Sequence, residues 1–248
     1  MKINIDRLYI KYKQKYSSDD PVWFLHNFTS EKDIEVMGLI ASCYSYGQIG
    51  VFKKFIEEFL NRIDNEPFEY VMKYKYKNEK KRLSGMDYRF NNANDLMNLI
   101  ENIRVNILKY GSLLNLFLVK YSEDDENILN ALKYFSGSMR KKYVSNLKGY
   151  DYLVPDVSKG STSKRLNLFL RWMVRKDEID LGIWSREVDK SKLIMPVDTH
   201  VYRVSREMKL VERNTCDMKY AIELTEKLKE YDPADPVKYD FALCHNDI

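Results

Sequence analysis

The 248-residue sequence predicts an all-helical protein. Apolar residues recur at helical spacing along most of the chain, whereas the alternation typical of strands is scarce. Nine glycines and six prolines are few for this length, which favours long elements with few sharp turns. The length allows one large domain or two lobes with a real core. No repeat or low-complexity linker divides the chain, so two lobes would share a continuous interface.

Composition argues for a cytoplasmic protein. Apolar residues make up 44% of the chain and charged residues 31%, which is typical of soluble globular proteins. No apolar run reaches the roughly 18 residues that a membrane span needs, so no membrane partner is expected. The N-terminal sequence MKINIDRLYIKYKQKY lacks the apolar centre of a signal peptide.

The cysteines and histidines indicate neither a disulfide framework nor a metal site. The three cysteines are an odd number and lie far apart, so free thiols are expected. The three histidines have no Cys or Glu at ligand spacing, so we expect no metal and no cofactor. These residues are Cys43, Cys216, Cys244, His26, His200 and His245. The net charge of +4 permits nucleic-acid binding without requiring it.

The N-terminal third predicts three helices. Residues 1–18 form a short amphipathic pattern. Ser30 can cap the next helix, with Asp33 three residues on as an acidic variant of the capping box. That helix ends near Gly47. Apolar residues at helical spacing over residues 52–60 predict the third.

The middle of the chain combines helical and charged segments. Residues 73–82 are basic with interleaved tyrosines, a composition used by nucleic-acid surfaces. A solvated helix face or loop explains the same composition. Asn94 or Asp95 is predicted to cap a helix that ends at Gly111, and Ser112 begins a short one. Acidic residues 123–126 are predicted at the front of another helix.

A basic helix is expected over residues 140–147, just before Pro155. Two helix starts after Pro155 then carry the most chemistry. A polar hairpin is expected over residues 156–161, and the segment Gly160-Ser161-Thr162-Ser163-Lys164 opens a helix with an apolar face. Backbone N–H groups at such a start favour a phosphate, and Arg171 and Arg175 on another face strengthen that interpretation. An ordinary surface helix with a lysine in its first turn is the alternative.

The second helix start is Pro196-Val197-Asp198-Thr199-His200. Asp198 is predicted to cap the helix that follows, because its carboxylate can accept backbone N–H groups. Capping alone explains an aspartate at this position. Together, however, Lys164 and Asp198 provide an amine and a carboxylate that can face each other.

These segments resemble the helix-hairpin-helix DNA glycosylase superfamily. The matching residues are Lys164 in the segment Gly-Ser-Thr-Ser-Lys-Arg-Leu-Asn and Asp198 in the segment Pro-Val-Asp-Thr-His-Val. Residues 33–42 and 235–243 resemble its early and final helices. The chain looks closest to an uncharacterised bacterial branch, somewhat similar to archaeal oxoguanine DNA glycosylases. The strong motifs cover about residues 155–206.

The resemblance implies a two-lobed helical bundle with a cleft between the lobes. One lobe would comprise residues 31–195 and the other residues 1–30 with 196–248. The hairpin here is longer and poorer in glycine than is usual in the superfamily. Lys164 and Asp198 lie 34 positions apart, so residues 177–192 must loop out if the two side chains are to meet. The four-cysteine cluster of some relatives is absent from the sequence.

The implied activity is removal of a damaged base, such as an oxidised purine, from double-stranded DNA, with abasic-site lyase activity. Neutral Lys164 would attack the sugar, and ionised Asp198 would stabilise the positive charge that develops there. The target base would leave the stack first. Four residues are expected to contact the substrate: Tyr44, Tyr46, Gln48 and His200. Five are expected to contact phosphate: Gly160, Ser161, Thr162, Ser163 and Arg165.

A second hypothesis is a non-catalytic protein that binds nucleic acid or another partner on the same scaffold. Packing or surface roles explain the four substrate-contact candidates equally well. Arg89 and Trp172 are ambiguous in the same way.

Overall fold

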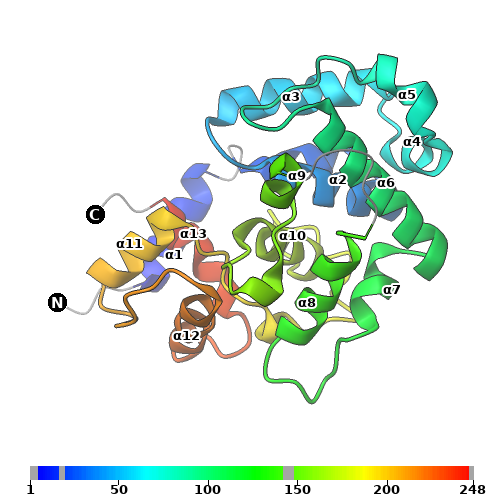
Figure 1. Ribbon diagram of the computed structural model, residues 1–248. Coiled ribbons are helices and arrows are strands. Elements are labelled where there is room, and N and C mark those ends of the chain that lie inside the picture. Colours follow the sequence, from blue (N-terminus) through cyan, green and yellow to red (C-terminus); the bar gives the residue numbers. More distant parts are fainter. Residues whose placement is uncertain (1–4, 17–19, 142–147, 246–248) are drawn as a thin grey trace. The chain divides into compact units, whose positions relative to one another are not determined.

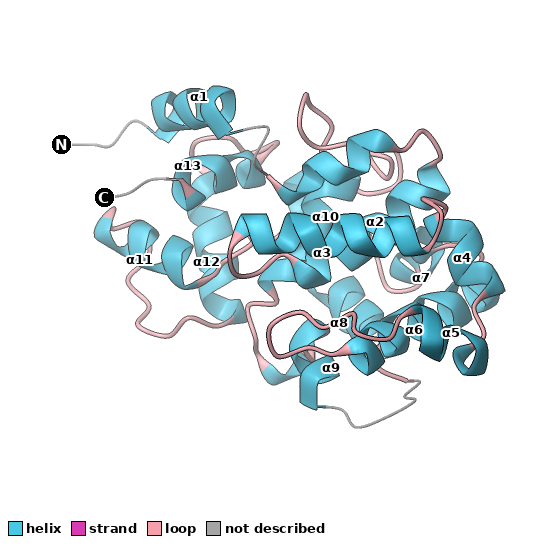
Figure 2. Ribbon diagram, turned by 90° about the horizontal axis from the view of Figure 1, so that it is seen from above, coloured by secondary structure: helices cyan, strands magenta, loops and turns pink. Residues whose placement is uncertain are grey.

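A computed structural model describes residues 5–16, 20–141 and 148–245. The described residues form helices joined by loops, with no strand among them (Figure 2). Two isolated bridges, Tyr88 with Asn91 and Lys176 with Leu181, are the only β-type pairings in these ranges. The all-helical prediction is therefore confirmed. No helix in the described ranges is both long and apolar enough to cross a membrane.

The chain divides into two compact units. Unit 1 comprises residues 1–23, 122–129 and 157–248, and unit 2 comprises residues 24–121 and 130–156. This division differs from the predicted one, because the segment 157–195 groups with the two ends of the chain. The physical reason is a set of buried ion pairs that join this segment to residues near both ends.

Unit 1 contains two helices near the ends of the chain that pack together. α1 (Ile5–Tyr16) packs on α13 (Asp240–Cys244), and α13 packs on α11 (Thr199–Glu207) (Figure 1). The remaining elements of unit 1 are η3 (Val157–Lys159), α10 (Lys164–Val174), η4 (Lys190–Lys192), α12 (Met218–Lys229) and η5 (Pro236–Tyr239). The sequence pattern did not predict α12.

Two arginines of α10 form the polar centre of unit 1. Arg171 contacts the carboxylates of Asp20 (2.9 Å), Asp180 (3.2 Å) and Asp240. Arg175 contacts Asp235 (2.8 Å), Asp177 (3.2 Å) and Asp180. Both arginines are buried, so neither is available to a phosphate. This corrects the prediction that they strengthen a phosphate site.

Unit 2 is built around two long helices. α6 (Ala93–Tyr110) packs on α4 (Pro67–Lys73), α7 (Leu113–Leu118) and α9 (Lys148–Leu153), and α2 (Glu31–Tyr44) packs on α4. The other helices of the unit are α3 (Ile49–Arg62), α5 (Tyr76–Arg82) and α8 (Leu129–Ser138), which begins at the boundary with unit 1. The 3₁₀ helix η2 (Pro21–Asn27) spans the point between residues 23 and 24 where the chain passes from unit 1 to unit 2.

Several predicted helix starts are confirmed and two are corrected. Ser30 caps α2 by accepting the N–H of Asp33, and Ser112 caps α7. The cap of α6 is Asn92, with Asp95 completing a capping box, rather than Asn94 or Asp95 itself. The acidic residues 123–126 precede α8 by several positions, because that helix begins only at Leu129. The acidic side chains therefore do not occupy its first turn.

Two predicted elements extend beyond the described residues. The predicted helix over residues 1–18 matches α1 over Ile5–Tyr16, while residues 1–4 and 17–18 lie outside the described ranges. Most of the predicted basic helix over residues 140–147 also lies outside them, since residues 142–147 are not described.

Candidate functional site

The loop before α10 is a helical turn followed by an irregular segment, not an extended hairpin. Residues 157–159 form η3, and Gly160 adopts a positive φ of 83°. The carbonyl of Gly160 accepts the N–H of Met218 at 2.9 Å, which ties the loop to the first residue of α12. The predicted hairpin is corrected to this turn, whose geometry follows from the extra residues between Pro155 and Lys164.

Ser163 sets the start of α10. It is a buried, non-glycine residue with a left-handed φ of 50°, a conformation that costs free energy and needs local support. Its N–H donates to Ser161 Oγ at 3.1 Å, and its carbonyl accepts the N–H groups of Leu166 and Asn167, both at 3.0 Å. Asn167 Nδ2 adds a bond to the carbonyl of Thr162 at 2.9 Å. This support makes Lys164 the first helical residue.

The predicted phosphate-contact residues are divided by burial. Ser163 is buried, and its hydroxyl donates to the Ser161 carbonyl at 3.3 Å, so its side chain serves the loop itself. Ser161 is exposed, and Thr162 and Arg165 are half-buried. Only the last three therefore keep side-chain surface open to a ligand.

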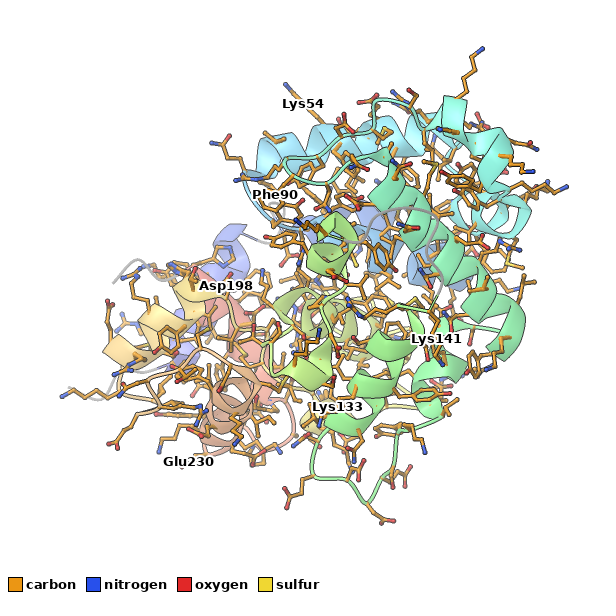
Figure 3. All side chains as sticks on the ribbon, viewed as in Figure 1. Lys54, Phe90, Lys133, Lys141, Asp198 and Glu230 are labelled. Carbon is orange, nitrogen blue, oxygen red and sulfur yellow. The ribbon has the colours of Figure 1, made fainter. Side chains whose placement is uncertain are left out.

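Asp198 caps α11, as predicted. Its Oδ1 atom accepts the N–H groups of His200 at 3.0 Å and Val201 at 2.9 Å. Figure 3 shows Asp198 at the start of this helix. The cap fixes the carboxylate while leaving the second oxygen, Oδ2, outside these two bonds.

The structure brings Lys164 and Asp198 together. The Lys164 Nζ atom lies 3.7 Å from Asp198 Oδ2. The two side chains are 27% and 40% exposed, so the pair is open to solvent on one side. Both residues belong to unit 1. An amine and a carboxylate at this distance can both reach one small reacting group.

The long segment between the two residues folds back on the end of α10. The carbonyl of Trp172 accepts the N–H groups of Leu181 (3.2 Å) and Gly182 (3.1 Å), and that of Met173 accepts the N–H of Trp184 at 2.7 Å. These bonds satisfy carbonyls that a helix end leaves without partners. The segment thus loops out of the way, as the meeting of Lys164 and Asp198 requires.

Two buried side-chain oxygens of unit 1 lack a hydrogen-bond partner in the described part of the chain. They are Asn167 Oδ1, three residues along α10 from Lys164, and Asp240 Oδ1. Burial raises the pKa of Asp240, against the opposing effects of Arg171 and Lys164. Buried polar atoms normally have a hydrogen-bond partner, so each of these two oxygens can still accept a hydrogen bond.

Two cysteines lie within electrostatic reach of the pair. Burial raises the pKa of Cys216, and Asp198 adds to the shift. Burial also raises the pKa of Cys244, and the charge of Lys164 opposes this rise. Raised pKa values keep both thiols protonated at neutral pH, so neither is an activated nucleophile.

Of the predicted substrate-contact residues, Tyr44 is corrected to a core residue. It is fully buried and packs between the rings of Phe55 and Tyr88. Its position follows from α2, which is buried along most of its length, so no face of the helix is left for a substrate. Trp172 is also fully buried.

The other three candidates keep some exposure. Tyr46 is half-buried and stacks on Phe90, and Gln48 is exposed at the start of α3. His200 is half-buried, and its Nε2 atom is enclosed without a hydrogen-bond partner in the described ranges. Tyr46 and Gln48 belong to unit 2, whereas His200 belongs to unit 1 beside Asp198.

The basic residues over 73–82 are exposed, whereas Tyr74 between them is buried. Most of this stretch forms α5, which buries no residue. Its one acidic residue, Glu79, accepts a hydrogen bond from the hydroxyl of Tyr70 at 3.0 Å. No group of His, Cys, Asp and Glu that can hold a metal ion lies within the described ranges.

Fold and site define an all-helical protein with a half-exposed lysine–aspartate pair at two helix starts. The chain belongs to the family described as "Protein of unknown function (DUF2400)", whose profile matches residues 20–248. No curated protein and no solved structure matches the chain.

The family assignment corrects the resemblance to the helix-hairpin-helix DNA glycosylase superfamily, which was wrong. The matching profile covers almost the whole chain and is that of an uncharacterised family, not of a glycosylase. The turn over residues 157–163 is consistent with this correction, because it replaces the predicted polar hairpin on which the resemblance partly rested.

Proposed function

We propose that this protein excises a damaged base from DNA through a covalent lysine intermediate. The observation that carries the proposal is the 3.7 Å separation between Lys164 Nζ and Asp198 Oδ2 in a half-exposed setting. A nucleophilic amine with a carboxylate beside it is suited to substitution at a carbon that becomes positively charged.

Lys164 is the proposed nucleophile. As a neutral amine it attacks C1′ of the deoxyribose, and the bond from C1′ to the base nitrogen breaks with its electron pair leaving on the base. Ring opening of the sugar then gives a Schiff base between Nζ and C1′. Loss of a C2′ proton from this intermediate permits elimination of the 3′ phosphate, which is the abasic-site lyase step.

Asp198 is proposed to stabilise the transition state. Its Oδ1 atom is held by two backbone N–H groups, so the carboxylate does not need to reorganise when the sugar becomes positive. Oδ2 faces the amine and remains available to the sugar. Oδ1 thus has the structural role and Oδ2 the chemical one.

The proton that Lys164 must lose can pass to Asp198, whose Oδ2 atom lies 3.7 Å from the amine.

A second candidate function is nucleic-acid binding without chemistry. The observation that favours it is that both residues already have structural roles. Asp198 completes the cap of α11, and Lys164 forms an ion pair with it. A protein that only bound DNA would retain both interactions.

Borohydride trapping distinguishes the two functions. Borohydride reduces a Schiff base to a stable amine, so DNA containing an abasic site should become covalently attached to the wild-type protein. Lys164→Gln should abolish the adduct while leaving folding intact. Lys219→Gln is the matched control, because Lys219 is an exposed lysine in the first turn of α12, which an aspartate also caps.

Loss of the adduct in the Lys164 variant alone supports the enzyme. An adduct that survives in that variant contradicts the assigned nucleophile. If the wild-type protein binds abasic DNA and forms no adduct, the binding function is favoured instead.

A further inference from the structure

A tight turn in unit 2 presents an arginine and a phenylalanine at its tip. Tyr88 and Asn91 exchange both backbone hydrogen bonds, at 2.8 and 2.9 Å, which leaves Arg89 and Phe90 as the two residues of the turn. Arg89 has a left-handed φ of 56°. A bulky residue adopts this conformation only where its surroundings impose it.

Phe90 is the most exposed aromatic side chain of this region. It is 57% exposed, and Figure 3 shows it at the surface of unit 2. Its ring stacks on Tyr46, with 5.4 Å between centroids and 17° between planes. Tyr152 meets it edge to face at 4.7 Å. The phenylalanine is therefore backed by two rings while much of its own surface stays open.

Hydrogen bonds hold this aromatic turn rigidly on three helices. The hydroxyl of Tyr46, after the end of α2, donates to Asn91 Oδ1 at 2.5 Å, and that of Tyr88 donates to the Tyr46 carbonyl. Asn91 Nδ2 donates to the Gly149 carbonyl in α9 at 2.7 Å and contacts Asp95 in α6 at 3.1 Å. The exposed ring is thus presented with little conformational entropy left to lose on binding.

Arg89 supplies positive charge beside the open ring. Its guanidinium carbon lies 5.7 Å from the Phe90 centroid, and none of the described carboxylates pairs with it. Its side chain fills the space over Gly47, where an added Cβ would lie 2.6 Å from Nη1. Gly47 also has a φ of 85°. The chain thus places glycine where the arginine must lie close to the backbone.

We infer that the turn formed by Tyr88, Arg89, Phe90 and Asn91, together with Tyr46 and Tyr152, binds an unpaired nucleobase. Base–aromatic stacking uses an open ring face, and an adjacent guanidinium contacts the phosphate that accompanies the base. The positive guanidinium beside the apolar ring complements the negative charge of a nucleic acid. The inference deepens the proposed function by naming its partner as nucleic acid with locally unpaired bases.

Undamaged DNA tests this surface without requiring any chemistry. Fluorescence anisotropy would give Kd for a labelled single strand and for the fully paired duplex of the same sequence. Phe90→Ala should weaken single-strand binding about 5- to 150-fold, because stacking of one base is lost. Duplex binding should change less than about twofold, because a paired base cannot reach the ring.

Two further variants serve as controls. Phe90→Tyr keeps a stacking face and should restore most of the affinity. Tyr231→Ala removes an aromatic residue that is 42% exposed in unit 1, and it should leave single-strand binding unchanged. The binding assay uses undamaged DNA and no borohydride, so failure of the covalent chemistry would not be confused with failure of this surface.

Three outcomes would overturn the inference. Unchanged single-strand affinity in Phe90→Ala would show that the ring does not contact a base. An equal loss on strand and duplex would indicate a general effect on DNA binding. A change in the oligomeric state measured by light scattering, with no change in affinity, would assign the ring to a contact between copies of the chain.

Discussion

At the residue scale, Asp198 shows how one side chain can serve a fold and a reaction. Its Oδ1 atom accepts two N–H groups at the start of α11, and its Oδ2 atom lies 3.7 Å from the Lys164 amine. An asparagine can still accept the capping bonds, whereas an alanine cannot. Substitution can therefore separate the two roles.

The free energy of unfolding of Asp198→Asn should lie within about 0.5 kcal/mol of the wild-type value, because the cap remains and the half-exposed ion pair contributes little. Asp198→Ala should lose about 1 kcal/mol. Both variants should trap abasic DNA about 100-fold more slowly, since each lacks the negative charge. Denaturant unfolding and timed trapping measure the two effects, and an unimpaired Asn variant would remove the carboxylate from the mechanism.

Asp180 provides a pH test at the same scale. Five carboxylates surround two guanidinium groups in the centre of unit 1. Burial raises the pKa of Asp180 to about 6, although Arg171 and Arg175 oppose the shift. The folded protein therefore binds more protons than the unfolded chain between about pH 4 and 6, so this group's contribution falls as pH rises through that window.

The free energy of unfolding of the wild type minus that of Asp180→Asn should fall from about pH 4 to pH 6 and stay level above pH 6. Denaturant unfolding at several pH values measures this difference. A difference that grows with pH would mean that the two arginines outweigh burial and lower the pKa of Asp180.

At the element scale, α10 is fixed at both ends by the loops that flank it. Ser163 begins the helix in a left-handed conformation, and residues 181–184 satisfy the carbonyls at its end. Gly182 makes this return possible. It has a φ of 62°, and an added Cβ would lie 2.5 Å from Lys176 Cβ and 2.9 Å from the Arg175 carbonyl oxygen.

Gly182→Ala should therefore destabilise the protein by about 1–3 kcal/mol, because both the backbone conformation and the space resist a methyl group. Gly50→Ala is the matched control. That glycine lies in α3 with no atom within 4 Å of an added Cβ, so alanine should stabilise by about 0.5–1 kcal/mol. Thermal unfolding compares the two; equal effects would contradict the role assigned to Gly182.

At the scale of the whole molecule, Arg171 links parts of unit 1 that are distant in the sequence. Its partners are Asp20 near the N-terminus, Asp180 after α10 and Asp240 near the C-terminus. The same helix carries Lys164 at its start. The buried ion pairs therefore help to fix the position of the proposed nucleophile within the unit.

Arg171→Met should destabilise the protein by about 3–5 kcal/mol, because it leaves buried carboxylates without their partner. Arg203→Met removes an exposed arginine paired with Glu207, and it should change stability by less than about 1 kcal/mol. Denaturant unfolding of both variants tests the contrast. Similar small losses in the two would show that the buried arginine does not organise unit 1.

Local chemistry explains which features the sequence could predict. Ser30, Ser112 and Asp198 cap helices through bonds to residues two or three positions away, so nearby residues suffice to find them. The burial of Arg171 and Arg175 could not be found this way, since their charged partners lie up to 151 positions along the chain.

The candidate site was predicted only in part. The two helix starts suggest that Lys164 and Asp198 can face each other, and the structure places them together. The family resemblance that assigned their roles proved wrong. Tyr44 was misplaced because tyrosine is equally suited to a core and a pocket. The exposed turn at Phe90 was missed as a site because Tyr46, Phe90 and Tyr152 are brought together only by the tertiary fold.

The most direct test of the account locates the covalent bond. Wild-type protein is incubated with abasic DNA and borohydride, digested, and analysed by tandem mass spectrometry. The account predicts one reduced sugar adduct, on the Nζ atom of Lys164. An adduct on another lysine or on the N-terminal amine, or none despite DNA binding, would contradict it.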